Sequence, residues 1–261
     1  MSNQANDLAS PVELLNLAGR VVVVTGASGS IGTGIVRRVV QAGASVLAHT
    51  HNRPFLPVDG LARDQIKTIS ADLTEPNGPE LVIQRALDHF GRLDGLVNNA
   101  GLQPTMGFDQ ASTQQSDSML ALNVTAPRQL TQLAAAAMQG GPSGGSIVNI
   151  ASIESRQPAP DHGLYAESKA ALVMQTKAAA QFYGPSHIRV NSISPGLIFR
   201  PNIEDEWPEG VERWRSAAPL KRLGRPDDVG DACVFLLSDL ARWITGVDLA
   251  VDGGVLVNPT W

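Results

Sequence analysis

Tyr165 and Lys169 lie four positions apart in the stretch "LYAESKAAL", residues 164–172, whose small side chains favour a helix. A helix brings such a pair onto one face. An ammonium group near a phenol favours the phenolate and lowers the usual phenol pKa of about 10, which suits proton transfer near neutral pH. An isolated pair of this kind is more often a solvated surface pair, so its interpretation depends on the rest of the chain.

A second candidate site is the stretch "TGASGSIG", residues 25–32, which directly follows the β-branched run "RVVVV". A tight turn with Gly26, Gly29 and Gly32 lets the backbone approach a pyrophosphate. The helix that follows offers its N–H groups and the positive end of its dipole to the phosphates. Because this turn joins the first predicted strand to the first predicted helix, it predicts a dinucleotide site.

The stretch "LAHTHNRP", residues 47–54, ends the second predicted strand and bears on the choice of dinucleotide. An acid there would bind the ribose 2′-OH of NAD and repel a 2′-phosphate, but the stretch contains none, and Thr50 stands in its place. His51, Asn52 and Arg53 follow, and an amide or a guanidinium can hold a 2′-phosphate. We expect NADP(H), with NAD(H) possible; a polar loop without phosphate contact is the other interpretation.

Strand and helix patterns alternate along the chain without a linker, an internal repeat or a low-complexity tract. Apolar runs predict strands within 20–32, 44–50, 66–73, 93–101, 144–152, 188–196 and 246–254. Helical spacing predicts helices over 31–43, 79–91, 116–138, 163–182 and 226–239. This alternation is typical of βαβ units. We therefore expect an α/β fold: a single doubly wound Rossmann-type domain over 19–261, with a central parallel sheet flanked by helices, after a frayed N-terminal extension at 1–18.

The composition restricts the class of partner. The 261 residues carry a net charge of -5, which argues against nucleic acid and against an acidic membrane surface. A single cysteine, Cys233, cannot form an intrachain disulfide, so we expect a reducing, cytoplasmic compartment. We expect no signal peptide, no membrane span and, because the five histidines lack metal-like spacing, no metal site.

These features together resemble those of the classical short-chain dehydrogenase/reductase family, and the likeness runs from about Gly19 to Gly254. The stretch 25–32 is similar to the glycine motif of the family, although Ser30 occupies the place of its middle glycine. The sequence "NNAG" at 98–101 matches the end of the family's fourth strand. This resemblance implies a nicotinamide-dependent oxidoreductase.

The resemblance also assigns roles to individual residues. Ser152 precedes Tyr165 by thirteen residues, as in the family's active site. By this likeness Tyr165 is the general acid in reduction or base in oxidation, and Ser152 binds the carbonyl oxygen. Lys169 holds the nicotinamide ribose, and Asn123 anchors a water that links Lys169 to solvent. The resemblance, together with the glycine-rich turn and the end of the second strand, predicts these cofactor contacts: Gly26, Ser28, Ser30, Ile31, Gly32, His51, Asn52, Arg53, Asp72, Leu73, Asn99, Ala100, Gly101, Tyr165, Lys169, Pro195, Gly196 and Ile198.

The segment 195–219 resembles the family least, and we expect a substrate lid around 197–218. Arg200 stands where the family commonly carries a threonine that contacts the nicotinamide amide. Phe199, Trp207 and Trp214 can form an apolar lid over the substrate. The pocket should also be lined by residues that follow the strand ends: Leu102, Gln103, Ile153 and Glu154. Asp161 and His162 can lie at its mouth, although a loop role is favoured for them.

An apolar, aromatic mouth favours a ketone or secondary alcohol as the substrate over a phosphorylated sugar. We therefore expect the transfer of a hydride between a nicotinamide cofactor and such a substrate. One alternative is an NAD-linked sugar or polyol dehydrogenase, and another is a catalytically idle nucleotide-sensing regulator. The stretch "LARWITGVDLAVDGG" resembles the C-terminal segment that the family uses at a subunit interface, and the Ala-rich helices can pack closely. We therefore expect a homotetramer.

Overall fold

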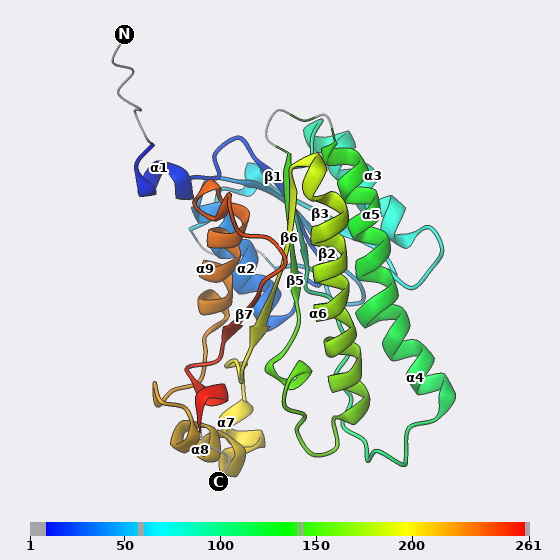
Figure 1. Ribbon diagram of the computed structural model, residues 1–261, viewed down its shortest axis with the longest axis vertical. Coiled ribbons are helices and arrows are strands. Elements are labelled where there is room, and N and C mark those ends of the chain that lie inside the picture. Colours follow the sequence, from blue (N-terminus) through cyan, green and yellow to red (C-terminus); the bar gives the residue numbers. More distant parts are fainter. Residues whose placement is uncertain (1–8, 57–59, 140, 142–143, 259–261) are drawn as a thin grey trace.

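Parallel strands form one central sheet in the computed structural model, which describes residues 9–56, 60–139, 141 and 144–258 (Figure 1). Within these residues the sheet has seven strands in the order β3-β2-β1-β4-β5-β6-β7, and every neighbouring pair is parallel. Their bounds are β1 Val21–Val24, β2 Ser45–Thr50, β3 Ile66–Ser70, β4 Gly95–Asn98, β5 Gly145–Ile150, β6 Ile188–Pro195 and β7 Asp248–Val251. The predicted Rossmann-type parallel sheet is therefore confirmed.

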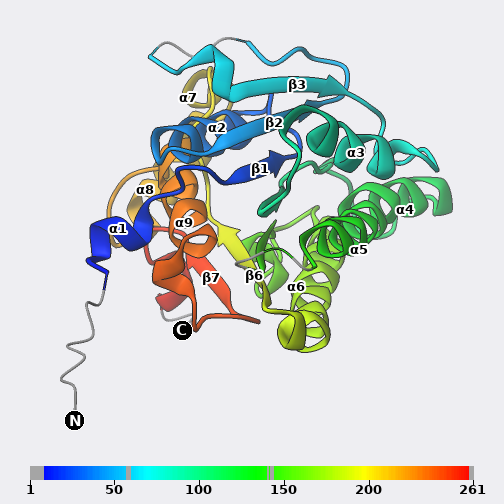
Figure 2. The same ribbon diagram turned by 90° about the horizontal axis from the view of Figure 1, so that it is seen from above.

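Helices cover both faces of this sheet. Their bounds are α1 Pro11–Leu15, α2 Ser30–Gln41, α3 Gly78–Phe90, α4 Thr113–Leu120, α5 Ala126–Met138, α6 Gly163–Tyr183, α7 Ile203–Glu206, α8 Pro208–Ala217 and α9 Pro226–Leu237. Figure 2 shows α2 and α9 on one face and α3, α5 and α6 on the other. Within the described part of the chain, no helix is both long and apolar enough to cross a membrane.

The alternation of side chains along β1 explains why its four valines are all buried. Val22 and Val24 belong to the core cluster beneath α2 and α9, whereas Val21 and Val23 belong to the cluster beneath α3 and α5. Successive strand residues point to opposite faces, and each fully buried valine stabilises the fold by roughly 1.5–3 kcal/mol. A sheet covered on both sides therefore needs a continuous apolar run rather than an alternating one.

The helix predicted over 116–138 is interrupted at its centre. After α4 ends, a π-helical turn spans Ala121–Thr125 before α5 begins. Pro127 has no N–H and cannot make the regular α-helical hydrogen bond. Instead, the N–H of Ala126 donates to the carbonyl of Ala121, five residues earlier. This wider turn places Asn123 in the interior, where it is fully buried.

Part of the predicted frayed extension is structured. Helix α1 begins at a capping box in which Ser10 and Glu13 hydrogen-bond to each other's backbone. Leu17 is completely buried, and its N–H donates to the carbonyl of Ala42 at 2.8 Å. Residues 1–8 of that extension lie outside the described residues, as do 57–59, 140, 142–143 and 259–261 of the predicted domain 19–261. These domain bounds stay a prediction.

Candidate active site

A cavity of about 1620 Å³ opens where the strands end. Its walls come from the loops after β1 to β6 and from α7 and α8, which Figure 1 shows at the lower end of β6. In open parallel sheets, ligands bind beyond the carboxyl ends of the strands at the point where the strand order reverses. The volume exceeds the roughly 300–1000 Å³ of a site for one small ligand, which leaves room for a dinucleotide and a substrate.

This cavity brings together most of the residues predicted from the sequence. Every residue predicted to contact the cofactor lines it, and so do Ser152, Tyr165 and Lys169. The four residues expected after the strand ends also line it: Leu102, Gln103, Ile153 and Glu154. Among the predicted catalytic and cofactor-binding residues, Asn123 alone does not line the cavity, and it is completely buried.

The glycine-rich turn fits the phosphates of a dinucleotide. Gly26 has a φ of +63°, and a Cβ added to Gly32 would lie 2.2 Å from the Gly26 carbonyl oxygen, so the turn closes tightly on itself. Gly29 is the N-cap of α2 and, among the described residues, no side chain caps this end. The first N–H groups of the helix and the positive end of its dipole are therefore available to a pyrophosphate in the cavity.

Ser30 replaces a family glycine without disturbing this turn. Its hydroxyl donates to the carbonyl of Phe199 at 2.9 Å. This hydrogen bond links the glycine-rich turn to the loop after β6, which begins the predicted lid. The departure from the glycine motif thus adds a contact between two walls of the cavity.

A buried histidine in β2 supports the turn from below. His49 is 2% exposed; its Nδ1 lies 3.3 Å from the N–H of Gly26, and its Nε2 lies 3.0 Å from the Ala71 carbonyl. Since an N–H must donate to Nδ1, the proton sits on Nε2. Burial lowers the pKa of His49, which keeps the ring neutral. Because side chains along a strand alternate with a period of two, His49 faces the same cavity as His51.

The end of β2 differs in one respect from the expectation. Thr50, predicted to stand where an NAD-binding chain has its acid, is 4% exposed, and its hydroxyl donates to the Ile69 carbonyl. His51, Asn52 and Arg53 line the cavity edge with exposed side chains. The Nε2 atom of His51 lies 3.6 Å from the Asp72 carboxylate. An acid therefore lies beside this edge although none stands at the end of the strand.

Tyr165 and Lys169 form a buried wall rather than a solvated pair. The Lys169 ammonium lies 5.6 Å from the centre of the Tyr165 ring and donates to the Ile150 carbonyl at 2.8 Å. Burial raises the pKa of Tyr165 to about 12, an effect that hydrogen bonding with Ser152 partly offsets. Burial also lowers the pKa of Lys169 to about 8. The expectation that Lys169 lowers the Tyr165 pKa stays a prediction, because burial is the largest effect on this phenol and raises its pKa.

Asn123 holds the loop after β4 against this wall. Its side-chain amide donates to the Leu102 carbonyl at 2.9 Å and accepts from the Leu102 N–H at 2.8 Å. A Cβ added to Gly101 would lie 3.2 Å from Asn123 Oδ1 and 3.5 Å from Lys169 Nζ. A side chain at position 101 would thus crowd both Asn123 and Lys169. A role for Asn123 in water binding stays a prediction.

Two tryptophans, rather than three aromatic residues, line the substrate side. Trp207 and Trp214 face the cavity, whereas Phe199 is 43% exposed and is not among the described residues that line it. The Trp214 ring packs so closely on Gly196 that a Cβ there would lie 2.6 Å from it. Arg200, in the place of the family threonine, lines the cavity and forms an ion pair with Glu206.

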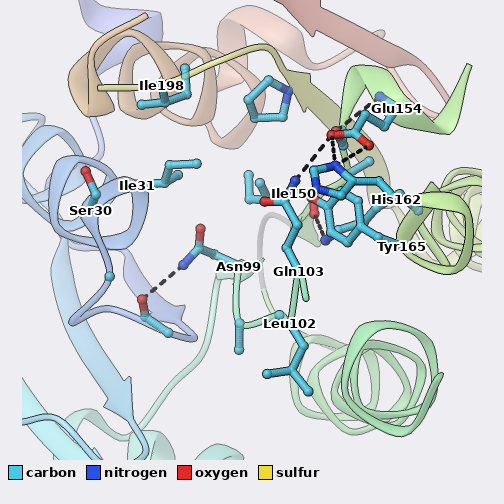
Figure 3. A pocket seen from close by; sticks show the side chains of 18 of the residues that line it. Ser30, Ile31, Asn99, Leu102, Gln103, Ile150, Glu154, His162, Tyr165 and Ile198 are labelled. Atoms are coloured by element: carbon cyan, nitrogen blue, oxygen red, sulfur yellow. Dashed lines mark hydrogen bonds and ion pairs between the residues drawn. The ribbon is translucent and has the colours of Figure 1, made fainter. Parts of the chain in front are cut away.

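The cavity lining also contains a polar cluster of Gln103, Glu154 and His162 (Figure 3). The Glu154 carboxylate lies 3.0 Å from His162 Nδ1 and accepts from Gln103 Nε2 at 3.2 Å. The second ring nitrogen of His162 lies 3.3 Å from the Thr105 hydroxyl. His162 thus has a defined place in the cavity wall, although its sequence context favoured a loop role.

Comparisons with known proteins agree with this geometry. Residues 26–256 match the family model described as enoyl-(acyl carrier protein) reductase. An L-xylulose reductase of Caenorhabditis elegans is 36% identical over 243 residues, which cover 91% of this chain and 96% of that protein. Glucose 1-dehydrogenase 2 of Bacillus subtilis is 29% identical over 94% of this chain and 98% of its own length. A crystal structure named as that of a short-chain alcohol dehydrogenase from Sinorhizobium meliloti 1021 superposes with a TM-score of 0.84 at 31% identity, covering 94% of this chain and all of the other.

Proposed function

The chain belongs to the short-chain dehydrogenase/reductase family, and from that premise we propose that Tyr165 transfers the proton and that NADP(H) is the preferred cofactor. It is an oxidoreductase that couples a nicotinamide cofactor to ketones and alcohols. The observation that carries the proposed mechanism is the buried Tyr165–Lys169 wall, which faces the same cavity as the glycine-rich turn.

The state of Tyr165 suits the reduction of a ketone. With a pKa of about 12, the phenol keeps its proton at neutral pH and can donate it to a carbonyl oxygen. When bound, a reduced nicotinamide would supply the hydride for the carbonyl carbon. Ser152, whose hydroxyl accepts from the Glu154 N–H at 3.1 Å, can donate to the same carbonyl oxygen and stabilise its developing charge. The product is a secondary alcohol, and oxidation reverses each transfer.

Lys169 positions the cofactor and influences the charge near Tyr165. Of its three N–H donors, one is taken by the Ile150 carbonyl, which leaves two for the ribose hydroxyls of a bound nicotinamide. The glycine-rich turn would hold the pyrophosphate, and Pro195, Gly196 and Ile198, which line the same cavity, would contact the nicotinamide.

A preference for NADP(H) is supported by the cavity edge after β2. His51, Asn52 and Arg53 lie there, and the guanidinium of Arg53 can form a charge-assisted hydrogen bond with a 2′-phosphate. Asp72 opposes this preference through its negative charge, but His51 lies 3.6 Å from its carboxylate and screens it when protonated. NAD(H) remains the alternative cofactor.

A sugar or polyol is the second candidate substrate class. Its support is that L-xylulose reductase and glucose 1-dehydrogenase 2 are among the similar proteins, and that Gln103, Glu154 and His162 give one side of the cavity hydrogen-bonding groups. The test is to follow the absorbance of reduced nicotinamide with simple ketones, ketoses and the corresponding alcohols. Turnover of ketones or alcohols is expected; no turnover of any member with either cofactor would contradict the proposal.

We also infer a homotetramer in a reducing, cytoplasmic compartment. Large apolar side chains are exposed on α6 and in the C-terminal segment: Met174, Phe182 and Trp243, the last 97% exposed. Such surfaces support burial against another copy of the chain. The only cysteine, Cys233, is buried, and burial raises the pKa of its thiol, which supports a structural rather than a redox role.

A further inference from the structure

We propose that Glu154, held in place by His162, accepts a hydrogen bond from a hydroxyl group on the carbon next to the reacting carbonyl, so that the enzyme selects α-hydroxy ketones. This inference rests on the proposed ketone reduction and specifies the substrate within it. Glu154 becomes a residue that determines specificity, and His162 becomes a positioning residue.

The backbone fixes Glu154 beside the reacting centre. Ser152, two residues after the end of β5, is the N-cap of the 3₁₀ turn Ile153–Ser155. Glu154 lies in this turn, and its N–H donates to the Ser152 hydroxyl at 3.1 Å. Its carboxylate raises the pKa of Tyr165 through its negative charge, after the larger effect of burial. Glu154 thus lies next to both groups proposed to hold the carbonyl oxygen.

The carboxylate has acceptor capacity left for a ligand. Its Oε1 atom accepts from Gln103 and is 3.2 Å from His162 Nδ1, whereas Oε2 contacts His162 Nδ1 alone among the described residues, at 3.0 Å. An ionised carboxylate has about four lone-pair sites and can only accept. Its side chain is 14% exposed, so few water molecules can reach the remaining sites. A ligand hydroxyl is the natural donor for them.

His162 keeps this carboxylate in one orientation. Because Nδ1 faces a carboxylate, it carries a hydrogen. The other nitrogen lies 3.3 Å from the Thr105 hydroxyl, so the ring is held at both ends. The His162 ring also lies edge-on to the Tyr165 ring, with their centres 6.2 Å apart. The carboxylate cannot turn away from the cavity without breaking these contacts.

An acceptor-only group at this place discriminates between ketones. A simple ketone would cover the Glu154 carboxylate without offering it a donor, and a buried polar group left unpaired is strongly unfavourable. A phosphate or carboxylate on the same carbon would be repelled by the like charge. Trp207 and Trp214 also line the cavity and offer apolar contact to the carbon chain. The polar and apolar parts of the lining together fit a small hydroxylated carbon chain.

The test compares hydroxyacetone with methoxyacetone, which has a similar electron-withdrawing oxygen but no donor. We expect the native protein to prefer hydroxyacetone in kcat/KM by about tenfold to a hundredfold, the range for a hydrogen bond to a charged group. Glu154→Gln, which keeps the size but removes the charge, should lower this ratio at least about fivefold. Asp161→Asn is the matched control, because Asp161 is exposed in the same loop and its φ of 59° is one that asparagine tolerates.

A second measurement separates this role from a structural one. The charged or titratable groups around Tyr165 are Lys169, Glu154 and His162, so removing the Glu154 charge should move the alkaline rise of alcohol oxidation to lower pH. Equal turnover of both ketones by the native protein, or a ratio and pH profile unchanged in Glu154→Gln, would overturn the inference. A native protein that reduces no ketone at all would instead overturn the proposed function.

Discussion

Replacing Lys169 with methionine should stabilise the ligand-free protein while removing its activity. The side chain is 5% exposed, and burial lowers its pKa from 10.5 to about 8. At about 1.36 kcal/mol per pKa unit, keeping the buried ammonium charged near neutral pH costs about 3 kcal/mol. The variant also loses the hydrogen bond to the Ile150 carbonyl, and this loss offsets about 1 kcal/mol of the stability gained by removing the buried charge. We therefore expect Lys169→Met to unfold with a free energy about 2 kcal/mol larger near neutral pH.

This advantage should disappear in alkaline solution. A folded pKa below the unfolded pKa means that, between about pH 8 and 10.5, the unfolded chain holds more protons, so the native protein gains stability as the pH rises. Near about pH 9.5 the cost of Lys169 falls to about 1 kcal/mol, and the two proteins should be almost equally stable. Tyr165 keeps its proton in the folded protein over this range, because burial raises its pKa to about 12.

The assay is urea unfolding followed by circular dichroism, without cofactor and at one protein concentration, near neutral pH and near about pH 9.5. Lys177→Met is the matched control, because Lys177 is exposed on the same helix α6. Its effect should not change between the two conditions. The argument that burial destabilises the Lys169 ammonium would be refuted if Lys169→Met were less stable than the native protein near neutral pH. It would also be refuted if the difference in unfolding free energy between the two proteins were the same at both pH values.

Arg53→Ala should lower the kcat/KM ratio of NADPH to NADH by about ten- to a hundredfold, because a charge-assisted hydrogen bond contributes roughly 1.5–3 kcal/mol. A native preference for NADH, or an unchanged ratio in the variant, would count against the phosphate site. Alcohol oxidation needs the phenolate of Tyr165, so its rate should increase with rising pH toward the Tyr165 pKa, which burial raises to about 12. Ketone reduction needs the phenol, so its rate should not increase with pH in this way. Initial rates in both directions across the pH range check it. Light scattering at micromolar concentration should give about four chains per particle, and a stable, active monomer would exclude the proposed assembly.

The sequence predicted the sheet and the cavity lining because both depend on local patterns. Continuous valines at 21–24 require burial on two faces, and parallel strands bring their carboxyl ends to one edge. Residues at those ends, such as Asn99 and Ser152, therefore meet in one cavity although they are far apart in the chain.

Features that depend on packing between distant segments could not be predicted. Pro127 is a local signal for the π-helical turn that contains Asn123. The burial of the Asn123 side chain, however, depends on its hydrogen bonds to Leu102 and Ser168, which are distant in the sequence. The pKa of Tyr165 depends on how deeply the cavity wall is buried, whereas the sequence supplies only the neighbouring charge. The orientation of His162 toward Glu154 likewise depends on a turn eight residues away.

The most direct test of the central claim is the turnover of Tyr165→Phe, which removes one hydroxyl and keeps the ring that packs in the wall. Cofactor affinity, measured by titrating the fluorescence of reduced nicotinamide, should stay nearly unchanged, because Lys169 and the glycine-rich turn are intact. Ketone reduction should fall by several orders of magnitude, because Ser152 and Lys169 remain but no phenol can give its proton to the carbonyl oxygen. A folded Tyr165→Phe protein with near-native turnover would contradict the assignment of proton transfer to Tyr165.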